Sequence, residues 1–235
     1  MTKRFDGQLA LVTGASRGIG AATAKALAAE GAHVILTART AGALEQVEEA
    51  IHAAGGTATI APLDLIETDS IARLASAVEE RWGTLDILVL NAATLGSLSA
   101  VQAIDAKEFA KVMTLNVSAQ QALIAAFDAA LRKSARARVV GITSKVGRQP
   151  RAFWGAYGAS KAAFETLVQA YGEEVEGISN IRVALLDPGA TRTEMRARAY
   201  PGEDPASVKP PEIVADKIVE LVASDAASGH FERIA

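Results

Sequence analysis

The stretch "LALVTGASRGIGAATAKALAAEGAHVILTAR", residues 9–39, contains the pattern that the rest of the chain repeats. A short apolar run at 9–14 predicts a strand, and an alanine-rich run at 19–31, ending at Gly31, predicts a helix. Residues 33–39 predict a second strand. Strand, helix and strand in this order indicate two parallel strands, because parallel neighbours need a crossover connection between them.

The alternation continues along the chain. Further strands are predicted at 58–65, 85–93, 138–144 and 181–189, with a last one near the carboxyl end; helices are predicted at 41–56, from a cap at Thr68 or Asp69 to Trp82, at 105–133 and around 155–176. Strands that are apolar on both faces indicate a parallel sheet buried on both sides. We therefore predict an α/β chain forming one Rossmann-type doubly wound domain over residues 1–235, with about seven strands in the order 3-2-1-4-5-6-7 and helices on both faces.

Composition excludes several classes of function. The net charge of −3 does not favour nucleic acid, and the absence of cysteine excludes disulfides and thiolate metal sites. The histidines, His33, His52 and His230, are isolated in sequence, so no metal is expected. The first residues lack a signal peptide's long apolar run, and the longest uncharged span, 87–104, carries too many polar groups for a membrane helix. We expect a soluble, cytoplasmic protein with neither nucleic acid nor membrane as a partner.

The turn "TGASRGIG", residues 13–20, joins the first strand to the first helix. Glycines at 14, 18 and 20 let the backbone turn sharply and approach a ligand closely, and the helix behind them offers free N–H groups and a positive dipole end. The spacing differs from G-x-G-x-x-G, and tight turns need glycine in any case. Its place after the first strand of a doubly wound sheet predicts a dinucleotide site.

The end of the second predicted strand bears on the choice of dinucleotide. An NAD site commonly has a carboxylate there for the ribose 2′-hydroxyl, whereas this chain has Ala38 and Arg39, and Arg17 lies in the glycine turn. Guanidinium groups grip phosphate, which favours NADP(H) over NAD(H); the alternative is that both arginines are only surface side chains. Asp64, after the third strand, is placed to bind the adenine amino group, or else serves as a loop or capping residue.

Tyr157 and Lys161, in "WGAYGASKAAFETL" at 154–167, lie four residues apart and share a helix face. The pair belongs either to an ordinary amphipathic helix or to an acid/base site. At about 4 Å and an effective dielectric of about 20, the ammonium would attract a phenolate by about 4 kcal/mol. That attraction would lower the pKa of the phenol by a few units before the opposing cost of desolvation is counted.

Several motifs taken together resemble those of short-chain dehydrogenases/reductases. They are "TGASRGIG", "NAA" at 91–93, Asn116, Ser144, Tyr157-x-x-x-Lys161 and "PGATRT" at 188–193. Their order and spacing match the family over nearly the whole chain, with Ser144 thirteen residues before Tyr157 and Asn116 twenty-eight before Ser144. Within the family, the segments at 144–161 and 188–205 look most like the YciK-like bacterial oxidoreductases.

The resemblance implies an NADP(H)-dependent oxidoreductase that interconverts a carbonyl and a primary or secondary alcohol by hydride transfer. It implies that Tyr157 is the general acid/base, that Lys161 holds the nicotinamide ribose, that Ser144 polarises the substrate oxygen and that Asn116 holds a water linked to Lys161. The implied cofactor residues are Gly14, Ser16, Arg17, Gly18, Ile19, Gly20, Arg39, Asp64, Leu65, Asn91, Ala92, Tyr157, Lys161, Pro188, Gly189, Thr191 and Thr193. Ala93 stands where the family usually has glycine.

The substrate side and the assembly are open to more than one interpretation. The segment at 190–209, within a longer irregular stretch at 188–211, is expected to form a substrate loop. The arginines there and before Tyr157 either bind an anionic or acyl-carrier substrate or are solvated or at subunit contacts; the candidates are Arg148, Arg151, Arg192, Arg196 and Arg198, with Phe153, Trp154, Met195 and Tyr200. Helices that are apolar on more than one face predict a homodimer or homotetramer.

The same motifs leave two other functions to consider. A non-catalytic NADP(H)-binding redox sensor or regulatory module would keep the fold without turnover, but it has no need of the phenol of Tyr157. A nucleotide-sugar epimerase is disfavoured by the glycine spacing and by the short carboxyl-terminal part.

Overall fold

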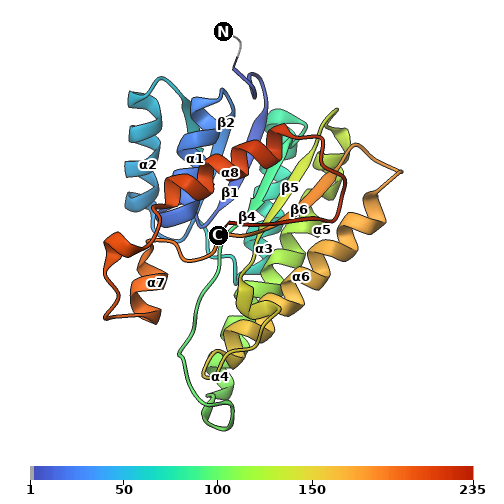
Figure 1. Ribbon diagram of the computed structural model, residues 1–235. Coiled ribbons are helices and arrows are strands. Elements are labelled where there is room, and N and C mark those ends of the chain that lie inside the picture. The colour runs from blue at the N-terminus through green and yellow to red at the C-terminus, as the bar shows by residue number, and fades with distance from the viewer. Residues whose placement is uncertain (1–2, 235) are drawn as a thin grey trace.

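The computed structural model describes residues 3–234 and contains one seven-stranded sheet in the order β3-β2-β1-β4-β5-β6-β7, with every neighbouring pair parallel (Figure 1). The strands are β1 Leu9–Thr13, β2 His33–Thr37, β3 Thr57–Ile60, β4 Ile87–Leu90, β5 Arg138–Ile142, β6 Arg182–Asp187 and β7 His230–Arg233. The predicted fold class and strand order are confirmed.

Helices connect the strands. They are α1 Gly18–Ala29, α2 Ala41–Ala53, α3 Thr68–Trp82, α4 Ala106–Met113, α5 Ala119–Lys133, α6 Gly155–Val175, α7 Glu194–Ala199 and α8 Pro211–Ala223, with 3₁₀ turns at Val101–Ala103, Lys145–Gly147 and Pro205–Ser207 and a π-helical turn at Thr114–Ser118. No helix within residues 3–234 is long and apolar enough to cross a membrane.

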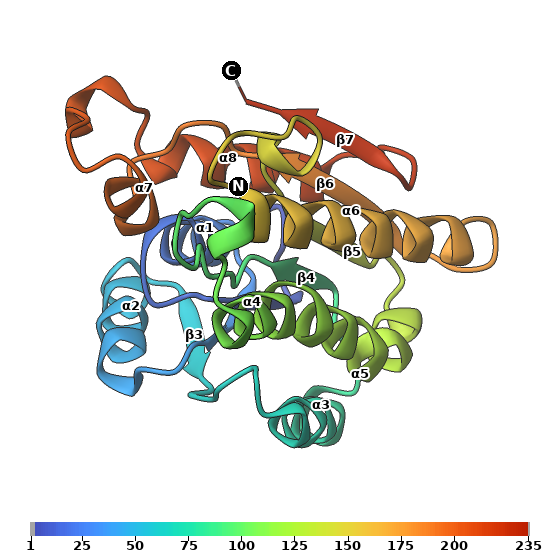
Figure 2. The same cartoon turned by 90° about the horizontal axis from the view of Figure 1, so that it is seen from below.

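The helices form a layer on each face of the sheet (Figures 1 and 2). Helices α1, α2 and α8 pack on one face and α3, α5 and α6 on the other, each over its own apolar cluster. Side chains of β1 alternate between the two clusters, Ala10 and Val12 in the first, Leu9 and Leu11 in the second. Since burying such a side chain contributes about 1.5–3 kcal/mol, the two-sided apolar strands hold the sheet between its helices.

All strands end at the same edge of the sheet because all are parallel. The order of connections reverses between β1 and β4, and ligands of doubly wound sheets bind in the crevice at that reversal. In Figure 1, α4 and α7 both project below the sheet at this carboxyl edge. The fold therefore places the glycine turn after β1 on the same edge as the residues that follow β4, β5 and β6.

The structure corrects several predicted elements. The strand predicted at 85–93 is limited to Ile87–Leu90, and the helix predicted at 41–56 ends at Ala53. The helix predicted at 105–133 is interrupted by the π turn at 114–118, and the strand predicted at 58–65 ends at Ile60, just before Pro62, which lacks an N–H for pairing. Helix α3 has Glu67, not Thr68 or Asp69, at its N-cap. The stretch predicted to be irregular at 188–211 contains α7, which is capped by the Thr193 hydroxyl, and a 3₁₀ turn.

Candidate active site

The glycine turn after β1 has room for backbone only. Gly14 has a φ of +65°, and a Cβ added at Gly20 would lie 2.3 Å from the Gly14 carbonyl oxygen. Arg17, the N-cap of α1, makes no side-chain cap bond, so the first N–H groups of the helix are left for a ligand. Ser16 and Ile19, the other predicted residues here, are half-buried in the same turn. The turn therefore fits the pyrophosphate of a dinucleotide.

Thr13 and Asn91 hold this turn in place through hydrogen bonds between the ends of β1 and β4. The Thr13 hydroxyl accepts hydrogen bonds from the backbone N–H of Asn91 (2.9 Å) and Ala92 (3.0 Å) and donates one to the Val89 carbonyl. The Asn91 amide donates to the Thr13 carbonyl at 2.8 Å. Asn91 and Ala92 thus join the ends of β4 and β1. The sequence prediction missed Thr13, whose signal is a hydroxyl directly before the glycine turn.

The predicted ribose and adenine residues lie further out on this edge. Arg17 is exposed and forms an ion pair with Glu194 of α7, while Arg39, after β2, is exposed. Asp64 accepts a hydrogen bond from the backbone N–H of Ile66 at 3.1 Å, which agrees with the alternative prediction of a loop residue. Leu65 is buried in the apolar cluster under α3, α5 and α6. Within residues 3–234, no hydrogen bond or ion pair joins Arg39 or Asp64 to the glycine turn.

The segment after β6 carries four predicted cofactor residues, Pro188, Gly189, Thr191 and Thr193. The Gly189 N–H donates to the buried Asp187 carboxylate at 3.0 Å, and Thr191 donates to the Pro188 carbonyl at 3.2 Å. A Cβ added at Gly18 would lie 3.3 Å from the Thr193 methyl group. The structure therefore brings this segment against the glycine turn, although the two are far apart in sequence.

Tyr157 and Lys161 are both buried in the first turns of α6. The Lys161 ammonium donates a hydrogen bond to the Ile142 carbonyl, at the end of β5, with a length of 2.8 Å. It lies 5.8 Å from the centre of the Tyr157 ring and 4.9 Å from that of Phe164. The predicted pair is therefore close in space, but the ammonium is directed to a backbone carbonyl.

Burial dominates the electrostatics of the pair. Desolvation lowers the pKa of Lys161 to about 8, against the opposing influence of the Glu165 carboxylate. Desolvation also raises the pKa of Tyr157 well above its ordinary value, and the Asp187 carboxylate adds to this rise. A net fall in the pKa of Tyr157 is therefore not found: burial and the Asp187 carboxylate raise this pKa, and the Lys161 ammonium is directed to the Ile142 carbonyl.

Asn116 lies in the π turn between α4 and α5 and is almost fully buried. Its amide donates to the Thr94 carbonyl (2.8 Å) and the Ser160 hydroxyl (3.0 Å), and its oxygen accepts from the Thr94 N–H (2.8 Å). Ser160 in turn donates to the Tyr157 carbonyl at 2.7 Å. Both amide hydrogens of Asn116 are thus used, so a water held by its side chain would have to bind the oxygen. Ser160, three residues after Tyr157, was not predicted.

Ser144 lies two residues beyond β5, as the N-cap of the 3₁₀ turn at Lys145–Gly147. Its carbonyl accepts a hydrogen bond from the Gly147 N–H at 2.9 Å, which fixes the turn. Within residues 3–234, neither the Ser144 hydroxyl nor the Tyr157 hydroxyl hydrogen-bonds to another group. Both hydroxyls are therefore left to a ligand oxygen.

Aromatic side chains from the start of α6 and the end of α7 form a cluster beside Tyr157. The Trp154 ring meets the Tyr157 ring edge-on at 6.0 Å, and Tyr200, just after α7, lies 5.8 Å from Trp154. Arg151 donates to the Tyr200 hydroxyl, and Arg196 covers the Tyr200 ring at 3.6 Å. The segment before α6 and the end of α7 thus form one aromatic wall.

Two of the arginines predicted for an anionic substrate already have carboxylate partners. Arg196 binds Glu203 through two hydrogen bonds of 2.6 and 2.5 Å, and Arg148 binds the buried Glu165 at 2.6 Å. For these two, a structural pairing explains the charge. Arg151, in contrast, contacts the aromatic wall.

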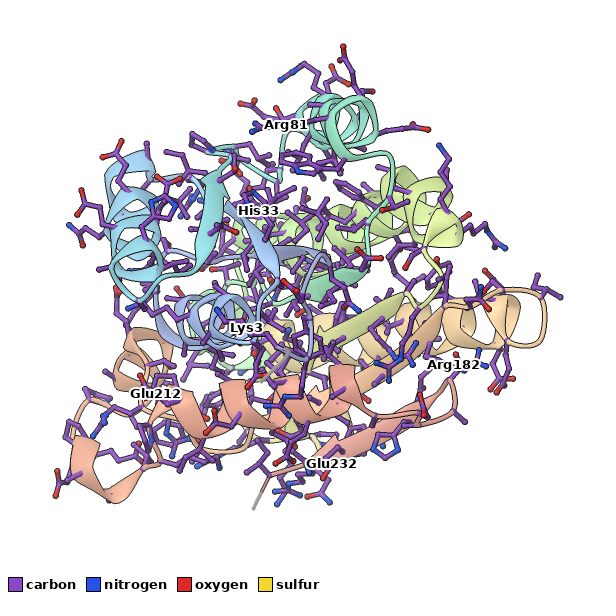
Figure 3. The ribbon with its side chains drawn as sticks, turned by 90° about the horizontal axis from the view of Figure 1, so that it is seen from above. Lys3, His33, Arg81, Arg182, Glu212 and Glu232 are labelled. Carbon is purple, nitrogen blue, oxygen red and sulfur yellow. The ribbon has the colours of Figure 1, made fainter. Side chains whose placement is uncertain are left out.

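The opposite, amino edge of the sheet has a hollow of about 430 Å³. Figure 3 looks onto this edge and labels Lys3 and His33, which line the hollow. Both ring nitrogens of His33 are hydrogen-bonded, to the hydroxyls of Thr57 (3.0 Å) and Thr59 (2.9 Å), and burial lowers its pKa. His33 is thus held by the sheet, and the groups suited to proton transfer gather at the carboxyl edge.

Comparison with known proteins places the chain among enzymes. A family model described as short chain dehydrogenase matches residues 8–204. The oxidoreductase YciK of Escherichia coli K12 is 36% identical over 224 residues, which cover 94% of this chain and 88% of YciK.

Solved structures agree along nearly the whole chain. A short chain dehydrogenase from Pseudomonas syringae superposes with a TM-score of 0.95 at 39% identity, covering 99% of this chain and 96% of that one. A short chain dehydrogenase from Escherichia coli CFT073, solved in complex with NADPH, has a TM-score of 0.94 at 35% identity, covering 99% and 98%.

The glycine turn generates a test of dinucleotide binding. Gly20→Ala would place a methyl group against the Gly14 carbonyl, so we expect loss of NADPH binding by at least about tenfold in Kd, measured by fluorescence titration. Gly42→Ala, on α2 with its nearest atom at 3.9 Å, is the matched control and should bind as the wild type does. Equal binding by Gly20→Ala would show that the ligand does not need this turn.

Burial of Lys161 predicts a pH-dependent stability. Below pH 8 the buried ammonium is charged and costly, so Lys161→Met should be more stable than the wild type by about 2–3 kcal/mol at pH 7 in urea unfolding. Between pH 8 and 10.5 the unfolded chain keeps the proton that the native state has lost, so wild-type stability rises and the difference should shrink. The exposed control Lys25→Met should show neither effect. A Lys161→Met variant less stable than the wild type at pH 7 would contradict the claim that burial of the Lys161 ammonium destabilises the fold and lowers its pKa.

Proposed function

We propose that this chain, which belongs to the short-chain dehydrogenase/reductase family, interconverts a carbonyl and a primary or secondary alcohol by hydride transfer with NADP(H). Membership makes the chain an oxidoreductase and confirms the resemblance predicted from its motifs, including that to YciK. The observation that carries the proposal is a pair of hydroxyls, Ser144 and Tyr157, without protein partners in residues 3–234, beside a buried ammonium and on the edge that holds the glycine turn.

Tyr157 would act as the acid in reduction. The bound dinucleotide supplies or accepts the hydride. The phenol of Tyr157 is protonated at neutral pH, since its ordinary pKa is about 10 and burial raises it further, and it can give its proton to the carbonyl oxygen as negative charge develops there. Ser144 would donate a hydrogen bond to the same oxygen. In the direction of oxidation Tyr157 must first lose its proton, and this step needs the Lys161 ammonium closer to the phenol than to Ile142.

The dinucleotide would bind across the ends of β1 and β4. The N–H groups at the start of α1 would hold the pyrophosphate, with Arg17 and Arg39 at a 2′-phosphate and Asp64 and Leu65 at the adenine. Asn91 and Ala92, which follow β4, would flank the bound dinucleotide. Residues 188–193, which follow β6, would flank it as well. Relatives solved with NADP and with NADPH support this choice of cofactor.

Further proposals concern the whole chain. Residues 1–235 would form one catalytic domain, with 190–209 as a substrate loop whose Tyr200 faces Trp154. Helices α4, α5 and α6 would build a homodimer or homotetramer.

The sensor alternative gains no support here, because a regulatory module does not require two unpartnered hydroxyls beside a buried ammonium. A cytoplasmic location stays a prediction.

Substitution of Tyr157 tests the reaction. NADPH oxidation should be screened against aldehydes, ketones and 3-oxoacyl thioesters, and Tyr157→Phe should lower kcat by about 10²–10⁴-fold because the proton donor is lost. Its Kd for NADPH should stay within about threefold of the wild type. Ser144→Ala should likewise lower kcat. Unchanged turnover by Tyr157→Phe would refute the assignment.

The choice of cofactor is tested separately. Arg17→Ala and Arg39→Ala should each weaken NADPH binding by about 10–100-fold, since a hydrogen bond to a charged group contributes about 1.5–3 kcal/mol, and should leave NADH binding unchanged. Arg81→Ala, which removes a guanidinium stacked on Trp82 near the opposite edge, is the control. Tighter wild-type binding of NADH than of NADPH would count against both arginines.

A further inference from the structure

Glu165 is a buried carboxylate on α6, one helical turn beyond Lys161. One of its oxygens accepts a hydrogen bond from the Thr143 hydroxyl (2.5 Å) and the other accepts one from the Arg148 guanidinium (2.6 Å). Thr143 precedes Ser144 directly, and Arg148 follows the 3₁₀ turn that Ser144 caps. The carboxylate therefore holds both ends of the segment that carries Ser144 against the helix that carries Tyr157 and Lys161.

The ion pair between Glu165 and Arg148 is unevenly exposed. The side chain of Glu165 is 7% exposed, whereas that of Arg148 is 41% exposed and lies over the Phe231 ring of β7 at 3.5 Å. Water screens the charge of Arg148 more than that of Glu165. Glu165 correspondingly opposes the fall that burial causes in the pKa of Lys161.

A carboxylate at this position is expensive for the fold. Replacing a buried ion pair with apolar residues of similar volume is often neutral or stabilising, so packing alone does not account for Glu165. Its two hydrogen bonds lie on either side of Ser144 in the chain, and Ser144 and the neighbouring Lys161 belong to the site described above. These contacts point to a role in the reaction.

We propose that Glu165 is a positioning residue, which keeps Lys161 charged and Ser144 in place opposite Tyr157, with Arg148 as the counter-charge that limits its effect. The proposal rests on the proposed function for its catalytic consequence. Its electrostatic part depends only on the fold, because it concerns the proton on Lys161.

Other titratable groups lie on the elements around Lys161. They are Tyr157 on α6, Lys145 and Arg148 in the turn after β5, Asp187 at the end of β6, and Lys107, Glu108 and Lys111 on α4, which packs against α6. Among the residues at 3–234, Glu165 is the charged group that acts on the pKa of Lys161. Asp187 acts on Tyr157 and is occupied by the Gly189 N–H and by Arg233 at 3.4 Å. The π turn at Thr114–Ser118 carries no charged side chain. Glu165 is therefore the carboxylate to vary.

Two substitutions should move the pH profile in opposite directions. In Glu165→Gln the amide can still donate to Thr143 and accept from Arg148, so the hydrogen bonds survive and only the charge is lost. The alkaline midpoint of kcat/KM for alcohol oxidation, where Lys161 loses the proton whose charge favours the Tyr157 phenolate, should fall by about one pH unit. Arg148→Gln leaves the carboxylate uncompensated and should raise the midpoint. Glu174→Gln, exposed on the same helix, should not change it.

A second readout does not depend on turnover. The pH range over which the stability difference between Lys161→Met and its parent shrinks reports the pKa of Lys161, and it should move lower when the parent is Glu165→Gln. If this range moves and no carbonyl is reduced, the electrostatic role stands and the proposed function fails. The positioning role is overturned if turnover is found but Glu165→Gln and Arg148→Gln leave both the kcat/KM midpoint and the pH range of the stability difference unchanged. It is also overturned if the two variants move these quantities in the same direction. Should Glu165→Gln fail to fold, Arg148→Gln alone decides by the direction of its midpoint.

Discussion

Helix α6 is tied to the end of β5 by a buried hydrogen bond from the Lys161 ammonium to the Ile142 carbonyl, 2.8 Å long. A charge in this position is costly, and the surroundings reduce the cost only in part, through one carbonyl, the faces of Tyr157 and Phe164, and the nearby Glu165 carboxylate. The site is arranged around this ammonium. Ser144 follows the same strand, Tyr157 precedes it on the same helix, and Asn116 reaches the helix through Ser160.

Burial gives the two directions of the reaction different requirements. A phenol whose pKa is raised stays protonated at neutral pH, so the proton that reduction needs is in place, whereas the phenolate that oxidation needs is scarce. Reduction can therefore begin from the arrangement seen here, whereas oxidation needs the ammonium to leave the Ile142 carbonyl and favour a phenolate. The low pKa of Lys161, about 8, means that its own proton is available near physiological pH. In this account Glu165 and Arg148 adjust the pKa of Lys161 and therefore the pH at which it loses that proton.

The sequence supported the fold because the fold depends on local patterns. Apolar runs such as Leu9–Thr13, followed by a glycine turn and an alanine-rich helix, have few alternatives to a parallel sheet. The spacing of Tyr157 and Lys161 predicted a shared helix face but left their role open. Their role was implied only by the joint resemblance of the glycine turn, Asn116, Ser144 and this pair to the family. The π turn at Asn116 could not be predicted, because it is held by Thr94 and Ser160, which are distant in sequence. The same holds for the pairing of Arg17 with Glu194 and for the bracing of the glycine turn by Thr13 and Asn91.

Ionisation of Tyr157 tests the central claim, that burial and not the neighbouring ammonium sets the proton affinity of the phenol before cofactor binds. An ultraviolet difference titration of the wild type against Tyr157→Phe, without dinucleotide, isolates the absorbance of this one phenolate from those of Tyr171 and Tyr200. The account predicts no phenolate signal from Tyr157 up to the ordinary tyrosine pKa of about 10. A midpoint at or below that pH would contradict it and would restore the ammonium as the dominant influence.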